Sequence, residues 1–181
     1  VVPDGVSISG VTGGFTIDNK IICNFNYVTF AAFSPNGKFF NWDFGDGTVS
    51  FGSVVTHLYS ESGTRFPKLV MQDSLKLCDN SFTDTITIFP IPDALMPENI
   101  SICTGDTIQI GPTIDSMTYS WSNGESTQFI DVFAEEIYSV LITDTVTGCA
   151  NTDSTILAHI PLPTSDLIES QTLCINDSIT L

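Results

Sequence analysis

The chain has 181 residues and a formal net charge of -16, and only five of its residues are Lys or Arg. Nucleic acids and anionic membrane surfaces are bound through basic faces, so this balance argues against both as partners. Hydrophobic residues make up 42% of the chain, more than a disordered acidic tail would carry. No window holds the roughly 18 apolar residues that cross a bilayer, so we expect no direct membrane insertion. The chain opens without an initiator Met or a signal sequence, and we expect it to be a piece of a longer protein.

Short β-strands are predicted along the chain. These segments are rich in Val, Ile, Thr and aromatic residues and are separated by Gly, Asn, Asp, Ser and Pro. They are, in chain order, 27–33, 39–44, 50–59, 66–72, 118–121, 129–133 and 137–143. No segment has the periodicity of an amphipathic helix of three turns. Several short strands in each stretch of about 70–80 residues are typical of a β-sandwich, so the predicted fold is all-β, with tandem immunoglobulin-like sandwiches.

An internal repeat organises the sequence. The run that begins at Cys103, with alternating apolar residues after a short turn, recurs at Cys174 and more loosely at Cys23. This pattern predicts a half-buried strand whose cysteine points inward near its start.

A second repeated block closes each unit. Asp73 and Cys78 recur as Asp144 and Cys149 at the same separation. A Thr-Asp strand follows each block, and it ends in a pair of prolines, Pro90 with Pro92 and Pro161 with Pro163. Because proline stops ladder pairing and stiffens linkers, we place boundaries near residues 92 and 164. The predicted units are residues 1–92, residues 93–164 and, at 165–181, the first strand of a third repeat.

The five cysteines fall as two, two and one along the units. We predict disulfides within each complete unit, Cys23 with Cys78 and Cys103 with Cys149, and a partner for Cys174 beyond residue 181. Each loop of about 50 residues would contribute on the order of 4 kcal/mol. Disulfides favour an extracellular or secreted location. The alternatives are free thiols in a cytosolic protein or a metal site, but the chain has no Cys-x-x-Cys pair.

Residues 40–48 read Phe-Asn-Trp-Asp-Phe-Gly-Asp-Gly-Thr, and His57, Tyr59 and Gly63 follow. This sequence resembles the signature of the PKD domain, an immunoglobulin-like module, over roughly residues 6–92. The resemblance implies that Trp42 and Phe44 point inward, that residues 45–47 form a tight turn, and that His57 opens the partner strand. Val55 stands where the family usually has proline, which affects the local register.

The second unit resembles the immunoglobulin-like repeats of large Bacteroidota surface proteins, including gliding-motility adhesins and proteins exported by the type IX secretion route. The resemblance rests on the segments 119–124, 137–140 and 143–144 and on Gly148 with Cys149. Trp121 and Tyr138 are interpreted as ordinary core residues.

Asp followed by Ser or Thr and then an aliphatic residue, Met or Thr occurs seven times. The hydroxyl residues are Ser74, Thr85, Thr107, Ser116, Thr145, Ser154 and Ser178. The triplet resembles the O-glycosylation acceptor motif of Bacteroidota extracytoplasmic proteins, so we expect a glycoprotein. The alternative is that Asp-Ser and Asp-Thr start strands and recur because the domain recurs.

The sequence indicates no enzyme and no cofactor. His57 and His159 have no recognisable nucleophile beside them, and Gly45 to Gly47 opens no helix and is no phosphate loop. Asp43 and Asp46 are weak candidates for a Ca²⁺ site; a role in capping the turn is the alternative.

We therefore predict a non-catalytic repeat segment of a large cell-surface adhesin or filament. It would act as a stalk or spacer with a role in adhesion or gliding motility, and its partners would be neighbouring repeats and a surface polysaccharide or protein ligand. The alternative is an accessory substrate-binding or spacer module of a secreted hydrolase or protease.

Overall fold

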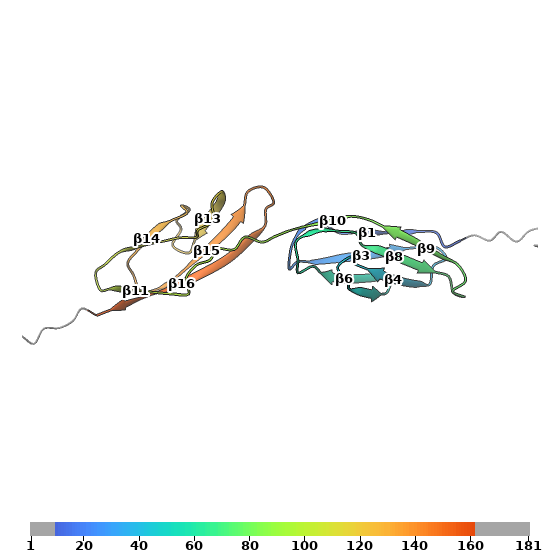
Figure 1. Cartoon of the computed structure of the whole chain (residues 1–181), viewed down its shortest axis with the longest axis horizontal. Helices are drawn as coiled ribbons and strands as arrows, with labels where there is room; N and C mark the ends of the chain where they lie inside the picture. The colour runs from blue at the N-terminus through green and yellow to red at the C-terminus, as the bar shows by residue number, and fades with distance from the viewer. Residues whose placement is uncertain (1–9, 162–181) are drawn as a thin grey trace, which may run out of the picture.

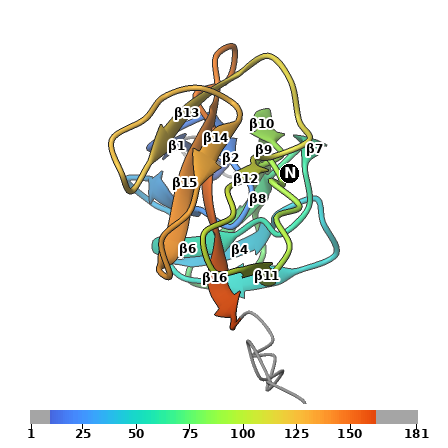
Figure 2. The same cartoon turned by 90° about the vertical axis from the view of Figure 1, so that its left-hand side faces the viewer.

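The computed structural model describes residues 10–161. Cys174, Ser178 and the predicted third repeat therefore lie outside the described residues. Two β-sandwiches stand end to end along one axis (Figure 1), and Figure 2 shows them one behind the other along that axis. The described part contains strands and no helix, which confirms the predicted all-β sandwich fold. It follows that no described helix is long and apolar enough to span a membrane.

The first sandwich is built from ten strands of the described part. They are β1 (Gly14–Ile17), β2 (Ile21–Cys23), β3 (Tyr27–Phe33), β4 (Phe39–Asp43), β5 (Val49–Phe51), β6 (Val54–Leu58), β7 (Gly63–Arg65), β8 (Lys68–Gln72), β9 (Asp79–Thr83) and β10 (Ile86–Phe89). One layer has the order β1-β3-β6. The other contains β5-β4-β8-β9 and, beyond a break, β2-β10-β7.

The break in the second layer has a local cause. Pro67 has no N–H and separates β7 from β8, while Asp84 and Thr85 separate β9 from β10. Across the gap the Asp84 N–H donates to the Pro67 carbonyl at 3.1 Å, so the two long strands stay side by side.

Alternation along the strands fills the first core. Val28 and Phe30 on β3 and Leu69 and Met71 on β8 have no exposed surface. The ring of Trp42 lies between the layers, and its Nε1–H donates to the Gly52 carbonyl at 2.8 Å. The indole is therefore buried without leaving its one polar group unpaired.

The second sandwich is built from six strands. They are β11 (Asn99–Cys103), β12 (Ile108–Ile110), β13 (Met117–Trp121), β14 (Ile130–Val132), β15 (Ile137–Asp144) and β16 (Ala150–Ile160). A sheet of order β11-β16-β15-β13 faces the pair β12-β14.

The second core, like the first, contains a buried tryptophan whose Nε1–H donates to a backbone carbonyl. Trp121 and Tyr138 are 3% and 4% exposed, which confirms that they are core residues. The Trp121 Nε1–H donates to the Thr127 carbonyl at 2.8 Å, as Trp42 donates to Gly52 in the first sandwich.

Two details differ from the strands expected from sequence. The cysteine does not start a strand: Cys23 ends β2 and Cys103 ends β11, and Cys103 is exposed. The turn after each cysteine contains a residue with positive φ, Phe25 and Gly105 respectively, so the chain must leave the ladder there.

The expected strand at 50–59 is two strands. β5 pairs with β4 in one layer and β6 pairs with β3 in the other. The chain changes layers at Gly52, whose φ of 132° is open to glycine and strained for other residues. His57 therefore lies near the end of β6, in the opposite layer from the Trp42 strand. The expectation that His57 opens this strand is wrong, because the strand begins at Val54, directly after the change of layer.

Candidate functional site

The signature turn joins β4 to β5. The Asp43 carboxylate accepts a hydrogen bond from the Gly45 N–H at 2.9 Å, and Asp46 Oδ1 accepts from the Thr48 N–H at 3.0 Å. Gly45 has a φ of 77°, and a Cβ there would meet the Phe66 backbone nitrogen at 3.0 Å. The tight turn predicted for residues 45–47 is confirmed, and both carboxylates hold it in shape.

His57 closes over this turn from the other layer. Its Nε2 lies 2.6 Å from Asp46 Oδ2, and its ring stacks on Phe44 with centroids 4.0 Å apart. Burial pushes the pKa of Asp46 upward, but the hydrogen bonds from Thr48 and His57 outweigh it, and the net pKa is below the usual value. The pair pins the signature turn to β6.

Tyr59 packs against His57 and joins the cluster formed by Phe44, Asp46 and His57. Its hydroxyl donates to the Phe44 carbonyl at 3.0 Å, and its side chain is 1% exposed. Burial raises the pKa of the Tyr59 phenol well above its usual range, so the hydroxyl remains a donor. The side chains of this signature are joined to each other as a structural latch.

The sequence candidates for other chemistry are accounted for within residues 10–161. No group of three or more His, Cys, Asp and Glu gathers there in a way that could hold a metal ion. A Ca²⁺ site at Asp43 and Asp46 stays a prediction; the oxygens that bind Gly45, Thr48 and His57 are already engaged. His159 lies on β16, and its Nε2 is 2.8 Å from the Phe133 carbonyl.

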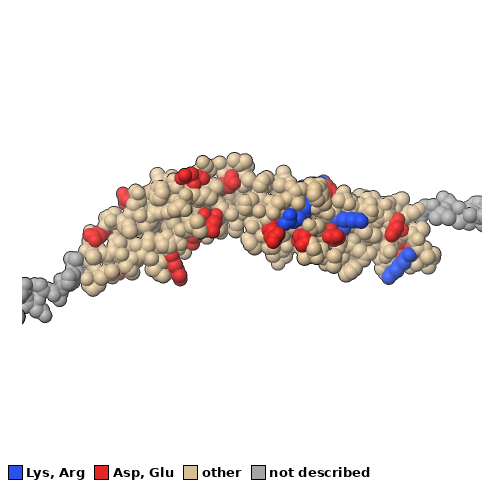
Figure 3. Space-filling view, in the orientation of Figure 1, with Lys and Arg blue, Asp and Glu red and all other residues tan. Residues whose placement is uncertain are grey.

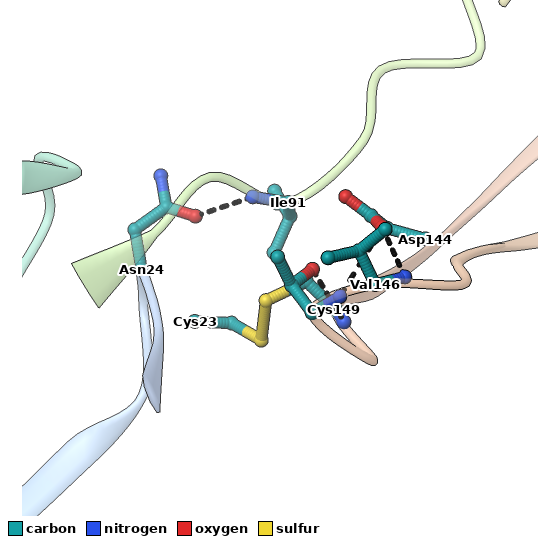
Figure 4. Close-up of a disulfide and its surroundings, with 7 residues drawn as sticks. Cys23, Asn24, Ile91, Asp144, Val146 and Cys149 are labelled. Atoms are coloured by element: carbon teal, nitrogen blue, oxygen red, sulfur yellow. Dashed lines mark hydrogen bonds between the residues drawn. A yellow bond between two sulfur atoms is a disulfide. The ribbon is translucent and has the colours of Figure 1, made fainter. Parts of the chain in front are cut away.

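The junction between the sandwiches carries the one disulfide of the described residues (Figure 4). Cys23 at the end of β2 is bonded to Cys149 in the β15–β16 hairpin, with Cα atoms 5.6 Å apart. The bond links the first sandwich to the second, across 126 positions of sequence.

The predicted pairs Cys23 with Cys78 and Cys103 with Cys149 are wrong. Cys23 lies opposite Phe89, where the first sandwich ends, whereas Cys78 lies in the β8–β9 hairpin at the far end. The second sandwich has the same arrangement, because Cys103 lies opposite Ile160 at its C-terminal end. Cysteines at opposite ends of one sandwich cannot meet the Cα separation of roughly 4.4–6.8 Å that a disulfide needs.

Side chains from both sandwiches hold the linker at 90–98. Asn24 Oδ1 accepts from the Ile91 N–H at 2.8 Å, and the Asn151 side-chain amide donates to the Pro92 carbonyl at 3.0 Å. Asp153 accepts from the Met96 N–H at 3.0 Å. The prolines and these hydrogen bonds fix the path of the linker beside the disulfide.

The hydroxyl residues of the Asp-Ser and Asp-Thr triplets are accessible. All six that lie in the described range are exposed: Ser74, Thr85, Thr107, Ser116, Thr145 and Ser154. Several of the preceding aspartates also cap turns, as Asp84 does for the Thr85 N–H at 2.7 Å. Accessibility fits a modification site, and glycosylation stays a prediction.

The charges are unevenly spread. All five Lys and Arg lie between Lys20 and Lys76, and in Figure 3 the blue atoms lie on the first sandwich alone. The described second sandwich carries acidic side chains with no basic residue to balance them. Repulsion between such faces opposes lateral association of copies.

A shallow depression of about 260 Å³ lies on the outer face of the first sandwich. It is lined by residues of β4, β5 and β8: Asn41, Trp42, Asp43, Val49, Phe51, Lys68 and Val70. Phe51, one of these lining residues, is 73% exposed. An exposed aromatic beside an apolar hollow can contact a ligand, although the hollow is smaller than most small-molecule sites.

The fold defines a tandem β-sandwich protein of the immunoglobulin-like class. The family model of the PKD domain matches residues 17–88, so the first sandwich contains a PKD domain. The signature that resembled this family in sequence lies within the matched residues. None of the curated proteins compared with the chain is similar to it.

Several solved structures are similar in part. One of them is a structure of carbohydrate-binding modules from a β-sandwich superfamily, which is 18% identical. The match covers 76% of this chain and 56% of that chain, with a TM-score of 0.45. The chain thus spans a little over half of that structure. The PKD1 domain of Vibrio anguillarum Epp is 21% identical over 45% of this chain and 96% of its own, with a TM-score of 0.39. The PKD1 domain of the Vibrio cholerae metalloprotease PrtV is 21% identical, and the match covers 45% of this chain and 99% of the PrtV domain, with a TM-score of 0.38.

Proposed function

We propose that this chain is a non-catalytic, extracellular stalk segment of a large cell-surface adhesin or filament. Its sandwiches would hold an adhesive or motile tip away from the cell, in a protein of the type that Bacteroidota export by the type IX route for adhesion or gliding. The end-to-end arrangement and the clamped linker support this role. The single observation that carries it is the disulfide across the junction.

A covalent bond at the junction changes how the chain bears tension. Force applied at the two ends passes from β2 through the sulfur atoms of Cys23 and Cys149 to β16. The 126-position segment that this bond encloses is therefore shielded from the load. Without the bond, unfolding of this segment would lengthen the chain by about 440 Å, at about 3.5 Å per residue. A stalk with such a bond keeps its length under pulling.

Single-molecule force spectroscopy of the whole chain, with handles at its termini, tests this proposal. We expect the oxidised chain to extend only by the residues outside the disulfide loop. Reduction, or the paired substitution Cys23→Ser with Cys149→Ser, should add about 440 Å of contour length. Equal extension of the oxidised and reduced chains would contradict a load-bearing junction.

The extracellular role has its own test in the source cells. Antibodies to this segment should label intact cells or the culture medium, and the parent chain should carry further copies of the unit. A parent with one copy beside a catalytic domain would favour the accessory module instead.

The second candidate function is a substrate-binding module of a secreted hydrolase or protease. It is favoured by the depression beside Phe51, where an exposed ring could stack on a sugar or contact a peptide. Retention on chitin, cellulose or collagen, lost in Phe51→Ala, would support it. Phe133→Ala is the matched control, because Phe133 is 66% exposed and lies on the other sandwich.

A further inference from the structure

Two cysteines of the described residues have no sulfur partner there. Cys78 is half-buried in the β8–β9 hairpin, and Cys103 is exposed at the end of β11. Their local surroundings match those of the two cysteines that do form the junction disulfide.

Cys103 occupies the place of Cys23. Each is the last residue of a strand that runs parallel to the final strand of its sandwich, opposite Phe89 for Cys23 and Ile160 for Cys103. The next N–H donates to that opposite residue in both cases, at 2.8 Å from Asn24 and at 3.1 Å from Thr104. Cys103 therefore lies at the C-terminal end of the second sandwich, as Cys23 does in the first.

Cys78 occupies the place of Cys149. The carbonyl of each accepts from the N–H of an aspartate five positions earlier, at 3.1 Å from Asp73 and at 2.8 Å from Asp144. The asparagine two positions later holds the incoming chain in both sandwiches. Asn80 donates to the Val11 carbonyl at 3.0 Å, as Asn151 donates to the Pro92 carbonyl.

The exposure of the cysteines agrees with this correspondence. Cys149, which has the first sandwich against it, is 1% exposed, whereas Cys78 remains half-buried. In the hairpin that carries Cys78, Leu75 and Leu77 are 71% and 80% exposed. This apolar tip lies at the N-terminal end of the first sandwich, where a preceding unit would cover it.

We propose that Cys103 bonds to the hairpin cysteine of a following unit and that Cys78 bonds to the strand-end cysteine of a preceding unit. This inference rests on the proposed function, because it needs neighbouring repeats. Each bond forms when two thiols lose two protons and two electrons, and the disulfide of a thiol–disulfide oxidoreductase in the export route accepts them and becomes a dithiol.

The staggered bonds enclose overlapping segments. Cys103 precedes Cys149 in the chain, so the loop closed at the next junction begins inside the loop closed at this one. Tension would then be carried from unit to unit through sulfur–sulfur bonds, and no complete sandwich would lie outside a covalent loop.

Disulfide mapping of the native full-length protein tests the pairing. The protein is isolated with N-ethylmaleimide and without reductant, then cleaved at Asp, because residues 77–181 contain no Lys or Arg. We expect the Cys103 peptide to be joined to an Asp-x4-Cys hairpin of the next unit and the Cys78 peptide to a strand-end cysteine of the previous unit. Alkylation of either thiol, a bond from Cys103 to Cys174, a bond within one unit or a bond between two identical cysteines would overturn the inference.

Substitution gives a second readout. Cys103→Ser should leave one new thiol, on the hairpin cysteine of the following unit, that a fluorescent maleimide labels. Ser101→Ala, an exposed change on the same strand, should leave none. New label on Cys149 or Cys23 instead would overturn the stagger. A parent chain without neighbouring units overturns the stalk itself, which separates the two failures.

Discussion

The Cα atoms of Cys23 and Cys149 lie 5.6 Å apart although 126 positions separate the two residues in sequence. The first belongs to the C-terminal end of one sandwich and the second to the N-terminal end of the next. Neither sandwich has a disulfide of its own within the described residues. The bond therefore acts on the junction, and the two buried cores hold the sandwiches themselves.

Cleavage in the linker should leave the two sandwiches joined. Limited digestion under native conditions at Asp93 or Glu98 is expected to give two fragments that migrate together without reductant and separate with it. The disulfide is the reason, since it bridges the cut. Cys78→Ser should behave like the unchanged chain, and separation of its fragments without reductant would argue against the Cys23–Cys149 bond.

Loss of the Asn24 side chain should loosen the linker without unfolding either core. In Asn24→Ala the Ile91 N–H loses its acceptor, so hydrogen exchange at that amide should rise by roughly 2- to 12-fold, which corresponds to the roughly 0.5–1.5 kcal/mol that one such bond contributes. NMR-detected exchange measures this. Asn36→Ala is the control, because Asn36 accepts from the Thr12 N–H at the other end of the sandwich and should change exchange there alone.

Removal of the Tyr59 hydroxyl should destabilise the first sandwich by about 1–2 kcal/mol, because the buried Phe44 carbonyl would lose its donor. Urea denaturation of Tyr59→Phe, followed by the NMR amide signals of β3 and β8, measures the free energy of unfolding of the first sandwich. Tyr27→Phe should have no effect, since Tyr27 is 72% exposed. Equal stabilities for the two variants would contradict the latch.

The latch should also make stability depend on pH. The pKa of Asp46 is below its usual value of 3.8 in the folded chain. The unfolded state therefore binds the proton first, and the stabilisation is present above that usual value and is lost as the pH falls through the folded pKa. Asp46→Asn should be less stable than the unchanged chain by about 1–2 kcal/mol at pH 6, and the difference should vanish well below pH 4. Asp79→Asn, an exposed carboxylate in β9, should show no such convergence.

Natively secreted protein should carry glycans on the exposed triplet hydroxyls. Glycopeptide mapping should find added mass at Thr85, and Asp84→Ala should remove it because the aspartate is part of the acceptor motif. Thr56 is the internal control, since it is exposed but follows Val55. A peptide mass at Thr85 that matches the bare chain would leave the triplets with their turn-capping role alone.

Local features of the fold could be predicted from sequence. Alternation along 27–33 and 137–143 gives the buried faces of β3 and β15, and the Gly-Asp-Gly run gives the turn after β4. Trp42 and Trp121 are recognised as core residues because alternation along each strand places the large ring on the face that points between the two layers. The matched PKD residues contain the signature on which the resemblance was based.

The partners of the cysteines could not be predicted in this way. The repeat shows that Cys23 corresponds to Cys103 and Cys78 to Cys149. It does not show at which end of a sandwich each cysteine lies. The sequence offered one weak signal. The strand that ends at Cys23 pairs with the strand that leads into the proline linker, so Cys23 lies at the linker end of the sandwich.

The sequence by itself determined the strand class, the repeat and the composition of each core, because side-chain periodicity is a property of neighbouring residues. Only the tertiary structure decided the disulfide and the latch between Asp46 and His57. Both depend on the layer and the direction in which a strand runs, and those follow from pairing between distant segments. In each sandwich the parallel pairing of the cysteine strand with the last strand carries its sulfur to the C-terminal end, within reach of the next unit.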